Sequence, residues 1–293
     1  MSYTIGFIGL GTMGLPMATH LQNRGHSLKL YARRAEVFAQ QAKPLIDAGA
    51  IPCLSLAEVA TDVDLIITNV LGTADVQELL IDGPDAVIHH AKLGTCIIDH
   101  STIDPSATAT MAATLAKAGL EMVDAPVSGG VWAAQGGTLV AMIGGSDHAC
   151  QRAMEVIDAY TKQVTRVGTS GHGQIAKLCN QIAQVITIEG VAESLSFAKA
   201  LGADPAKVFA AIEGGMGGSP MMTLMGPKMI AADYQAGIAA RLHAKDAGIA
   251  AEASRSHDLN LPCLEVVHQQ YQRLMADGLG DHDSSMLIEM LKR

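Results

Sequence analysis

The stretch Gly9-Leu10-Gly11-Thr12-Met13-Gly14 has the spacing G-x-G-x-x-G, and it joins an apolar run, Thr4–Ile8, to a segment of helical periodicity, Met13–Asn23. We expect Gly9 to permit a tight turn, Gly11 to let the backbone approach a pyrophosphate, and Gly14 to let the helix pack closely on the strand. The free N–H groups at the start of the helix would then face the phosphates. This strand–loop–helix context predicts a dinucleotide-binding loop, whereas the spacing alone would also suit a structural glycine turn.

Short β-branched runs alternate with amphipathic segments through the first half of the chain. The runs predict strands at Thr4–Ile8, Ser27–Tyr31, Asp64–Thr68 and Thr95–Asp99, and further strands at the sheet edge at Met122–Asp124, Leu139–Ile143 and Val164–Val167. The segments between them predict helices at Met13–Asn23 and near residues 34–48, 74–81 and 105–118. Such alternation is typical of βαβ units and predicts a mostly parallel sheet.

After about residue 168 the pattern indicates helices only. An apolar segment from Gly173 to about Leu201 predicts one long helix, and Asp204-Pro205 has the residue types of an N-cap and a first helical position. Further helices are predicted near residues 205–213, 220–231, 241–258, 262–276 and 283–291. We therefore expect an α/β fold, in which a Rossmann-type dinucleotide-binding domain (residues 1–168) is joined by the long helix to an all-helical substrate and oligomerisation domain (residues 169–293).

Composition narrows the class of protein. The 293 residues carry a net charge of −9 without a large Lys/Arg cluster, which argues against nucleic acid as a partner. No apolar stretch reaches the roughly 18 residues of a membrane helix, and the first residues lack the basic region of a signal peptide. The five cysteines are scattered and suit free thiols in a reducing cytosol, and no histidine spacing predicts a metal site. We expect a cytoplasmic protein that binds neither nucleic acid nor membrane.

The end of the second predicted strand indicates which dinucleotide is bound. An NAD site usually has Asp or Glu about 20 residues beyond the glycine loop, where it binds the ribose 2′-hydroxyl. Here the strand ends Tyr31-Ala32-Arg33-Arg34, with no acid and two guanidinium groups. An arginine can pair with a 2′-phosphate, so Arg33 and Arg34 favour NADP, with NAD as the alternative. The two arginines could instead simply solvate the start of the next helix.

Four segments follow one another along the chain: Ile5–Leu21, Asp124–Gly130 (D-A-P-V-S-G-G), Gly171–Asn180 (G-H-G-Q-I-A-K-L-C-N) and His243–Asp246 (H-A-K-D). Together they resemble the β-hydroxyacid dehydrogenase family, which includes 3-hydroxyisobutyrate dehydrogenases, tartronate semialdehyde (2-hydroxy-3-oxopropionate) reductases and glyoxylate/succinic semialdehyde reductases. The run from Lys177 to Ile182 looks most similar to the tartronate semialdehyde reductases. The chain departs from many relatives at Asn69-Val70-Leu71-Gly72, where they have Met-Leu-Pro.

The resemblance implies a catalytic centre around Lys177. An ammonium group can stabilise a developing alkoxide and donate a proton to it, although partial burial would have to lower its usual pKa of about 10.4. Ser128, Gly129 and Gly130 would bind the substrate carboxylate through a hydroxyl and free backbone N–H groups, unless the glycines only serve a tight turn. Asn180 shares a helix face with Lys177 and would bind the substrate, or else bridge the helix to a loop.

The resemblance also implies cofactor contacts away from the glycine loop. The loop containing Val70 and Leu71 would face the cofactor, and Thr102 would lie beside the nicotinamide ribose at the carboxyl end of a strand. Lys245 would close over the cofactor or the substrate carboxylate, the alternative being an ion pair with Asp246.

The predicted function is NADPH-dependent reduction of a small carboxylated aldehyde, with tartronate semialdehyde, which gives glycerate, as the preferred substrate. Alternatives are a 3-hydroxyisobutyrate or other 3-hydroxyacid dehydrogenase, a glyoxylate or succinic semialdehyde reductase, and a non-catalytic NADP-binding module. By the resemblance we also expect a homo-oligomer, either a dimer or a tetramer.

Overall fold

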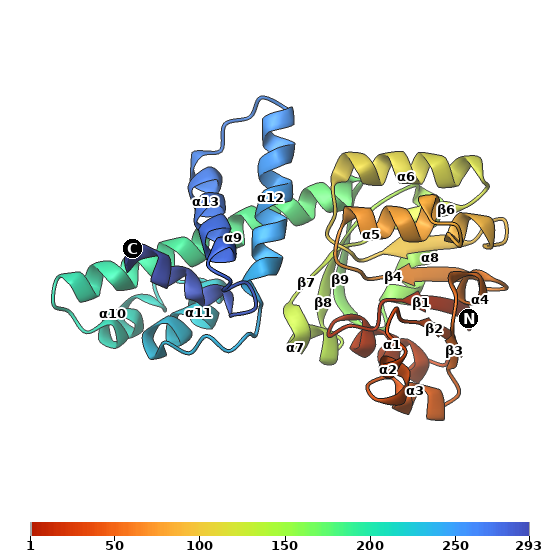
Figure 1. The fold of residues 1–293 in the computed structure, drawn as a ribbon, viewed down its shortest axis with the longest axis horizontal. Coiled ribbons are helices and arrows are strands. Elements are labelled where there is room, and N and C mark those ends of the chain that lie inside the picture. The colour runs from red at the N-terminus through yellow and green to blue at the C-terminus, as the bar shows by residue number, and fades with distance from the viewer. Residues whose placement is uncertain (1, 293) are drawn as a thin grey trace. The chain divides into compact units, whose positions relative to one another are not determined.

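The computed structural model describes residues 2–292. The chain divides into two compact units, Met1–Lys177 and Leu178–Arg293 (Figure 1). Within the described chain, no helix combines the length and the hydropathy that a bilayer crossing requires.

The first unit is built on one nine-stranded sheet. In sheet order its strands are β3 (Ile51–Cys53), β2 (Ser27–Tyr31), β1 (Thr4–Ile8), β4 (Leu65–Thr68), β5 (Cys96–Asp99), β6 (Glu121–Asp124), β8 (Leu139–Gly144) and β7 (Val127–Ser128), with β9 (Thr161–Gly168) also beside β8. The strands are parallel from β3 to β6, and β8 is antiparallel to β6 and β7 but parallel to β9. The central strands β1, β4 and β5 are almost entirely buried and mostly apolar, since helices cover both faces of the sheet.

Successive side chains of these strands enter two separate hydrophobic cores. On one face pack α1 (Gly14–Asn23), α2 (Glu36–Ala39), α3 (Lys43–Asp47), α7 (Gly130–Gln135) and α8 (Asp147–Ile157). On the other pack α4 (Leu56–Ala60), α5 (Thr73–Gln77), the π-helix η1 (Glu78–Asp82), the 3₁₀-helix η2 (Val87–His89) and α6 (Pro105–Lys117). Figure 1 shows α5 and α6 together on one side of the sheet. This doubly wound arrangement confirms the predicted Rossmann-type fold.

The register of the parallel strands brings four loops together. Ile8 lies opposite Thr68, Thr68 opposite Asp99, and Asp99 opposite Asp124, so β1, β4, β5 and β6 end at one level. The loops that follow them therefore share one edge of the sheet, where ligands bind in open α/β folds.

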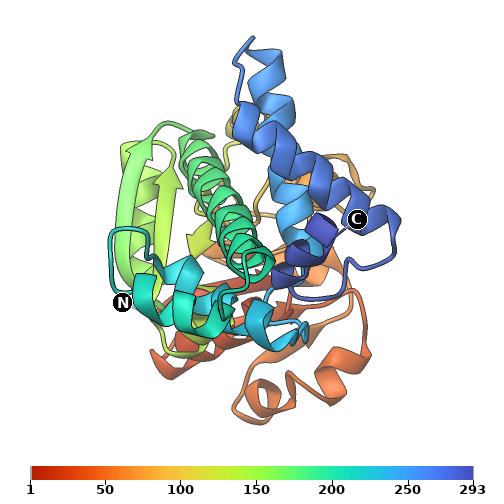
Figure 2. The same cartoon turned by 90° about the vertical axis from the view of Figure 1, so that its left-hand side faces the viewer.

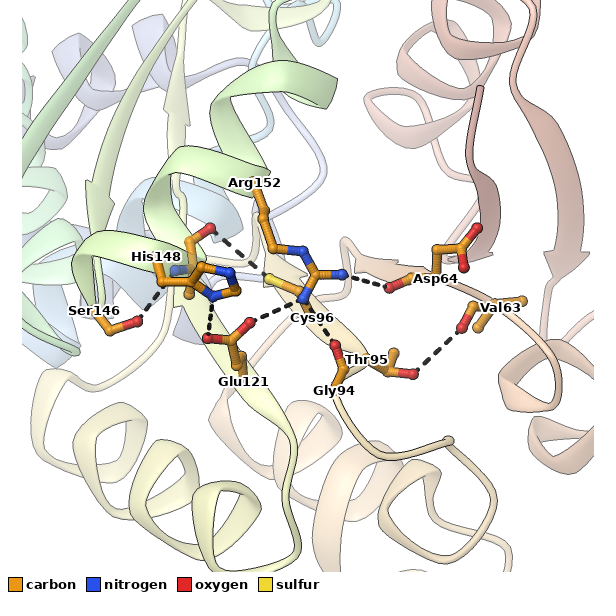
Figure 3. A network of polar contacts seen from close by, with 10 residues as sticks. Val63, Asp64, Gly94, Thr95, Cys96, Glu121, Ser146, His148 and Arg152 are labelled. Carbon is orange, nitrogen blue, oxygen red and sulfur yellow. Dashed lines mark hydrogen bonds and ion pairs between the residues drawn. The ribbon is translucent and has the colours of Figure 1, made fainter. Parts of the chain in front are cut away.

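The opposite edge, at the amino ends of the strands, is held by Arg152 of α8 (Figure 3). Its guanidinium donates to the carbonyl oxygens of Gly94 (2.8 Å) and Asp64 (3.2 Å) and to Glu121 Oε2 (2.9 Å). These contacts join the segments that lead into β4 and β5 to the first residue of β6. The charge of Arg152 is thus used for stability, away from the edge that carries the glycine loop.

The second unit is helical in its described part. The 29-residue helix α9 (His172–Ala200) begins in the first unit, and α10 (Pro205–Ile212), α11 (Pro220–Ala231), α12 (Ala240–Ser256), α13 (Pro262–Ala276) and the 3₁₀-helix η3 (Ser284–Lys292) follow (Figure 2). Leucine, valine, alanine and methionine side chains of α9, α11, α12 and α13 form its core. Asp204 accepts from the N–H of Ala206 (2.9 Å), which confirms the predicted cap of α10.

The elements differ from the predictions in a few places. The helix near residues 34–48 is two short helices, α2 and α3, because Pro44 has no N–H and its ring would clash in a continuous helix. The strands predicted at Met122–Asp124 and Leu139–Ile143 are not at the sheet edge, since β6 lies between β5 and β8, and β8 pairs with β6, β7 and β9. The segment near residues 283–291 is helical but of 3₁₀ type. The prediction omitted β3, β7, α4, α7 and α8.

Candidate active site

The glycine loop after β1 contains three glycines in different surroundings. Gly9 has φ +103°, and a Cβ there would collide with the carbonyl oxygen of Asn69. A Cβ on Gly14 would collide with the carbonyl oxygen of Gly9, so the start of α1 packs directly on the loop. A Cβ on Gly11, in contrast, would meet nothing within 4 Å. Two glycines are therefore required by packing, whereas Gly11 faces space that a ligand can enter.

A cavity of about 560 Å³ opens beside this loop. It is lined by the end of β1 and the glycine loop, by the end of β2 with Arg33 and Arg34, and by Val70, Leu71, Ala74, Asp75, Glu78 and Leu79. Gly9, Leu10 and Gly11 line it, whereas Thr12, Met13 and Gly14 lie in the turn that begins α1. No side chain caps that helix; the N–H of Leu15 donates to the carbonyl oxygen of Gly11 (3.0 Å), and Pro16 has no N–H. The open space at Gly11 and the adjoining cavity suit a dinucleotide.

Charge at the mouth of the cavity is mixed. Arg33 forms a long ion pair, 4.0 Å, with Asp75 of α5, and their side chains are 83% and 42% exposed. A pair this exposed and this long is worth little, so Asp75 does not neutralise the arginine strongly. Arg33 and Arg34 are thus placed where a phosphate on the ribose could be bound. Sequence reasoning overlooked Asp75 and Glu78, which lie on the helices after β4.

Lys177 lies on α9 with only 8% of its surface exposed. Its Nζ donates a hydrogen bond to the carbonyl oxygen of Val127 on β7, at 2.9 Å. Val127 directly precedes Ser128, so the structure brings together two motifs that lie about 50 residues apart. Gly129 and Gly130 have φ values of +129° and +68°, which residues other than glycine rarely adopt. The ammonium of Lys177 is therefore held beside a turn of the kind that binds anions.

Asp124, at the end of β6, anchors the start of α9. Its side chain is fully buried, and its two oxygens accept from the N–H groups of Gly171 (2.8 Å) and Gln174 (2.9 Å). Burial raises the pKa of this carboxyl, and the backbone hydrogen bonds oppose that shift. The contact fixes the first turn of α9, and Lys177 follows one turn later. Sequence reasoning quoted Asp124 only as the first residue of its motif, although an acid at a strand end was a usable signal.

Hydrogen bonds tie the loops after β4 and β5 to each other next to Val70, which lines the cavity. Asp99 Oδ1 accepts from Thr68 Oγ1 (2.8 Å) and from the N–H of Ser101 (3.1 Å), and Ser101 Oγ accepts from the N–H of Val70 (2.9 Å). Burial raises the pKa of Asp99 to about 6. Thr102 is half-buried in the second of these loops and does not line the cavity.

Asn180 and Lys245 belong to the second unit, where a chain of side chains links them. Asn180 Nδ2 donates to Gln181 Oε1 (2.9 Å), Gln181 Nε2 donates to Asp246 Oδ2 (2.5 Å), and Lys245 Nζ pairs with Asp246 Oδ1 (2.9 Å). The ion pair is the alternative weighed for Lys245 from the sequence, and its contact with a cofactor stays a prediction, as does the contact of Asn180 with a substrate. Sequence reasoning gave no role to Gln181, which shows no motif signal of its own.

Two protein families match the chain. Residues 4–168 match the family described as the NAD binding domain of 6-phosphogluconate dehydrogenase, and residues 171–291 match that described as NAD-binding of NADP-dependent 3-hydroxyisobutyrate dehydrogenase.

Individual relatives match over almost the full length. The chain is 34% identical to 2-hydroxy-3-oxopropionate reductase of Escherichia coli (strain K12), covering 98% of this chain and 97% of the relative. It is 35% identical to the mitochondrial 3-hydroxyisobutyrate dehydrogenase of Homo sapiens, covering 98% and 86%. Among solved structures, the 3-hydroxyisobutyrate dehydrogenase of Mycobacterium tuberculosis with L-serine superimposes with a TM-score of 0.89 at 28% identity, over 100% of both chains.

Proposed function

Since the chain belongs to the 3-hydroxyisobutyrate dehydrogenase family of NAD(P)-dependent oxidoreductases that act on CH–OH groups, we propose that it reduces a small carboxylated aldehyde with NADPH. The proposed substrate is tartronate semialdehyde and the product glycerate. The family matches confirm the resemblance of the four sequence motifs, and with it a nicotinamide dinucleotide cofactor. The identity of the substrate and the preference for NADPH are the parts that we propose.

One observation carries the proposed chemistry: the buried ammonium of Lys177 is hydrogen-bonded to the strand that leads into Ser128. In the proposed reaction Lys177 Nζ gives a proton to the aldehyde oxygen as negative charge develops there, and the C=O bond becomes a C–OH bond. A bound reduced nicotinamide supplies the hydride that the carbonyl carbon accepts. The hydroxyl of Ser128 and the N–H groups of Gly129 and Gly130 bind the substrate carboxylate and so orient the aldehyde.

Support for NADPH comes from the cavity beside the glycine loop. Its lining includes Arg33 and Arg34 at the end of β2, and Asp and Glu are absent from that strand end. Arginine can bind a phosphate with two parallel N–H···O bonds, whereas a 2′-hydroxyl offers it no charge to pair with.

The decisive experiment is the oxidation of NADPH and NADH by the purified protein with tartronate semialdehyde, glyoxylate, succinic semialdehyde or methylmalonate semialdehyde. We expect the highest kcat/KM with NADPH and tartronate semialdehyde. We also expect Lys177→Ala to lower kcat by about 100-fold or more, since general acid catalysis contributes about 10²–10⁴-fold.

The outcomes separate the parts of the proposal. Activity with methylmalonate semialdehyde alone would indicate a 3-hydroxyisobutyrate dehydrogenase. Preference for another aldehyde would change the assigned substrate, but the proposed type of reaction would stand. Lys162→Ala, at an exposed lysine of β9, is the matched control and should keep wild-type kcat. Undiminished turnover by Lys177→Ala would overturn the assignment of Lys177 as proton donor.

A further inference from the structure

The side chain of Gln174 connects three parts of the first unit. It lies on the first turn of α9, is fully buried, and no role for it is contained in the proposed chemistry. Its Oε1 accepts from the N–H of Ile103 (3.1 Å), and its Nε2 donates to the carbonyl oxygen of Ser101 (2.8 Å). The amide therefore binds the backbone on both sides of Thr102. The backbone N–H of Gln174 donates to Asp124 Oδ2 (2.9 Å) at the end of β6.

The connection continues in both directions from Gln174. Ser101 Oγ accepts from the N–H of Val70, so the loop after β4, which lines the cavity, is attached to the loop that Gln174 holds. In the other direction, Lys177 lies three residues further along α9, on the same helix face, and donates to Val127 beside Ser128. An unbroken series of hydrogen bonds and one helical turn thus joins the cavity wall to the ammonium of Lys177.

Burial makes this geometry stiff. The N–H of Ile103 and the carbonyl of Ser101 bond to Gln174 in the interior, where a lost partner is not replaced by bulk water. A shorter or apolar side chain at position 174 would release the loop from α9 without touching either the glycine loop or Arg33.

We infer that Gln174 is a positioning residue for the proposed reduction: its side-chain amide sets the place of Lys177 relative to the loops at Val70 and Thr102. This inference rests on the proposed function. It predicts that loss of the amide lowers the rate of the chemical step more than it weakens cofactor binding, because a shift of about 1 Å between reacting groups can cost about 100-fold in rate.

The test compares Gln174→Met with wild type, using steady-state kinetics with NADPH and the preferred aldehyde and calorimetric titration of NADPH without substrate. Methionine keeps the length and the apolar volume but makes neither hydrogen bond. We expect kcat to fall by about 10- to 100-fold while the Kd for NADPH changes by less than about threefold. Gln184→Met, at a partly exposed position on the same helix, is the matched control and should retain wild-type kcat.

A second variant, Gln174→Glu, guards against a simple folding defect. Glutamate keeps an acceptor for the Ile103 N–H but can donate to the Ser101 carbonyl only when it is protonated. The titratable groups on the neighbouring elements include Asp99 of β5, His100 directly after it, Asp104 before α6, Asp124 of β6, and His172 and Lys177 of α9. All of them are present in both proteins. We therefore expect the ratio of variant to wild-type kcat to rise as the pH falls from about 8 to about 6, since burial raises a glutamate pKa into that range.

Each outcome decides the inference. A kcat of wild-type size in Gln174→Met would overturn the inference. It would also be overturned if Gln174→Met lost folding and NADPH binding in parallel with kcat, while the kcat of Gln174→Glu relative to wild type did not change with pH. A wild-type protein that reduces no aldehyde would overturn the proposed function, and the positioning role with it. If wild type is active, Lys177→Ala is inactive and Gln174→Met is unimpaired, only the positioning role fails.

Discussion

At the scale of single residues, the end of β2 decides which dinucleotide the cavity favours. Arg33 extends into solvent and is engaged by Asp75 only at 4.0 Å, so most of its charge is available to a ligand. A charge-assisted hydrogen bond contributes about 1.5–3 kcal/mol, which corresponds to about 10- to 100-fold in affinity. Selectivity of that size can be measured directly.

We predict that Arg33→Asp lowers the ratio of kcat/KM for NADPH to that for NADH by about 10- to 100-fold. The aspartate removes the partner of the 2′-phosphate and supplies an acceptor for a 2′-hydroxyl. Initial rates with both cofactors at saturating aldehyde give the ratio. Arg24→Asp, at an exposed arginine that pairs with Asp158 at 3.6 Å, is the matched control. If Arg33→Asp left the ratio of kcat/KM for NADPH to that for NADH unchanged, Arg33 would not bind the 2′-phosphate.

At the scale of elements, different glycines of the β1–α1 loop serve helix packing and ligand binding. Gly14 is in contact with the carbonyl of Gly9, while Gly11 has open space around its Cα. The same substitution at these two positions should therefore have opposite consequences for stability and for ligand affinity.

We predict that Gly11→Ala weakens NADPH binding by about tenfold or more but changes the free energy of unfolding by less than about 0.5 kcal/mol. Its methyl group would occupy the space that a pyrophosphate needs. Gly14→Ala should lower the free energy of unfolding by about 1–3 kcal/mol, because its Cβ would be forced into the backbone of the loop. Urea unfolding and calorimetric titration of each variant check both statements. Wild-type affinity in Gly11→Ala would argue that the pyrophosphate lies elsewhere.

Helix starts show where element prediction worked and where a signal was missed. Asp204-Pro205 predicted the start of α10 correctly, because an N-cap depends on a few neighbouring residues only. The same logic was available at α4, where Glu58 N–H donates to Ser55 Oγ (3.1 Å), and at α8, where Ala149 N–H donates to Ser146 Oγ (3.1 Å). Both helices were omitted although Ser55 and Glu58 have the spacing of a capping box.

At the scale of the whole molecule, two adjacent buried residues make stability depend on pH in opposite directions. Burial raises the pKa of Asp99 from 3.8 to about 6, so between these values the folded chain keeps a proton that the unfolded chain releases. The stability due to Asp99 is therefore present at low pH and lost as the pH rises toward 6. Burial lowers the pKa of His100 from 6.5 to about 4, so its contribution rises with pH over nearly the same range.

We predict that Asp99→Asn removes the contribution of Asp99 to the free energy of unfolding, which decreases as the pH rises. The free energy of unfolding of the variant, relative to wild type, should increase by about 3 kcal/mol between about pH 4 and pH 7, at about 1.4 kcal/mol per unit of pKa shift. Urea unfolding at several pH values measures this difference. Asp47→Asn, at an exposed carboxyl of α3, is the matched control. A difference for Asp99→Asn that does not vary with pH would mean that folding does not raise the pKa of Asp99.

The sequence by itself determined the glycine loop and the longer elements, but not the short ones such as β3, β7 and α7. Periodicity, caps and the spacing of Gly9, Gly11 and Gly14 are local properties, and they predicted β1, β2 and the long helix α9 to within a residue. The motif around Lys177 was likewise visible, because it is a run of neighbouring residues.

Only the tertiary structure decided which of these residues meet. Hydrogen bonds join Lys177 to Val127, Gln174 to Ser101, and Gly171, just before α9, to Asp124. The partners lie 50, 73 and 47 residues apart in the sequence. Each of these contacts depends on the order of β5, β6, β8 and β7 in the sheet, and on the register that makes the ends of β5 and β6 coincide. Strand order and register are set by the packing of many side chains at once, and no local pattern in the sequence contains them.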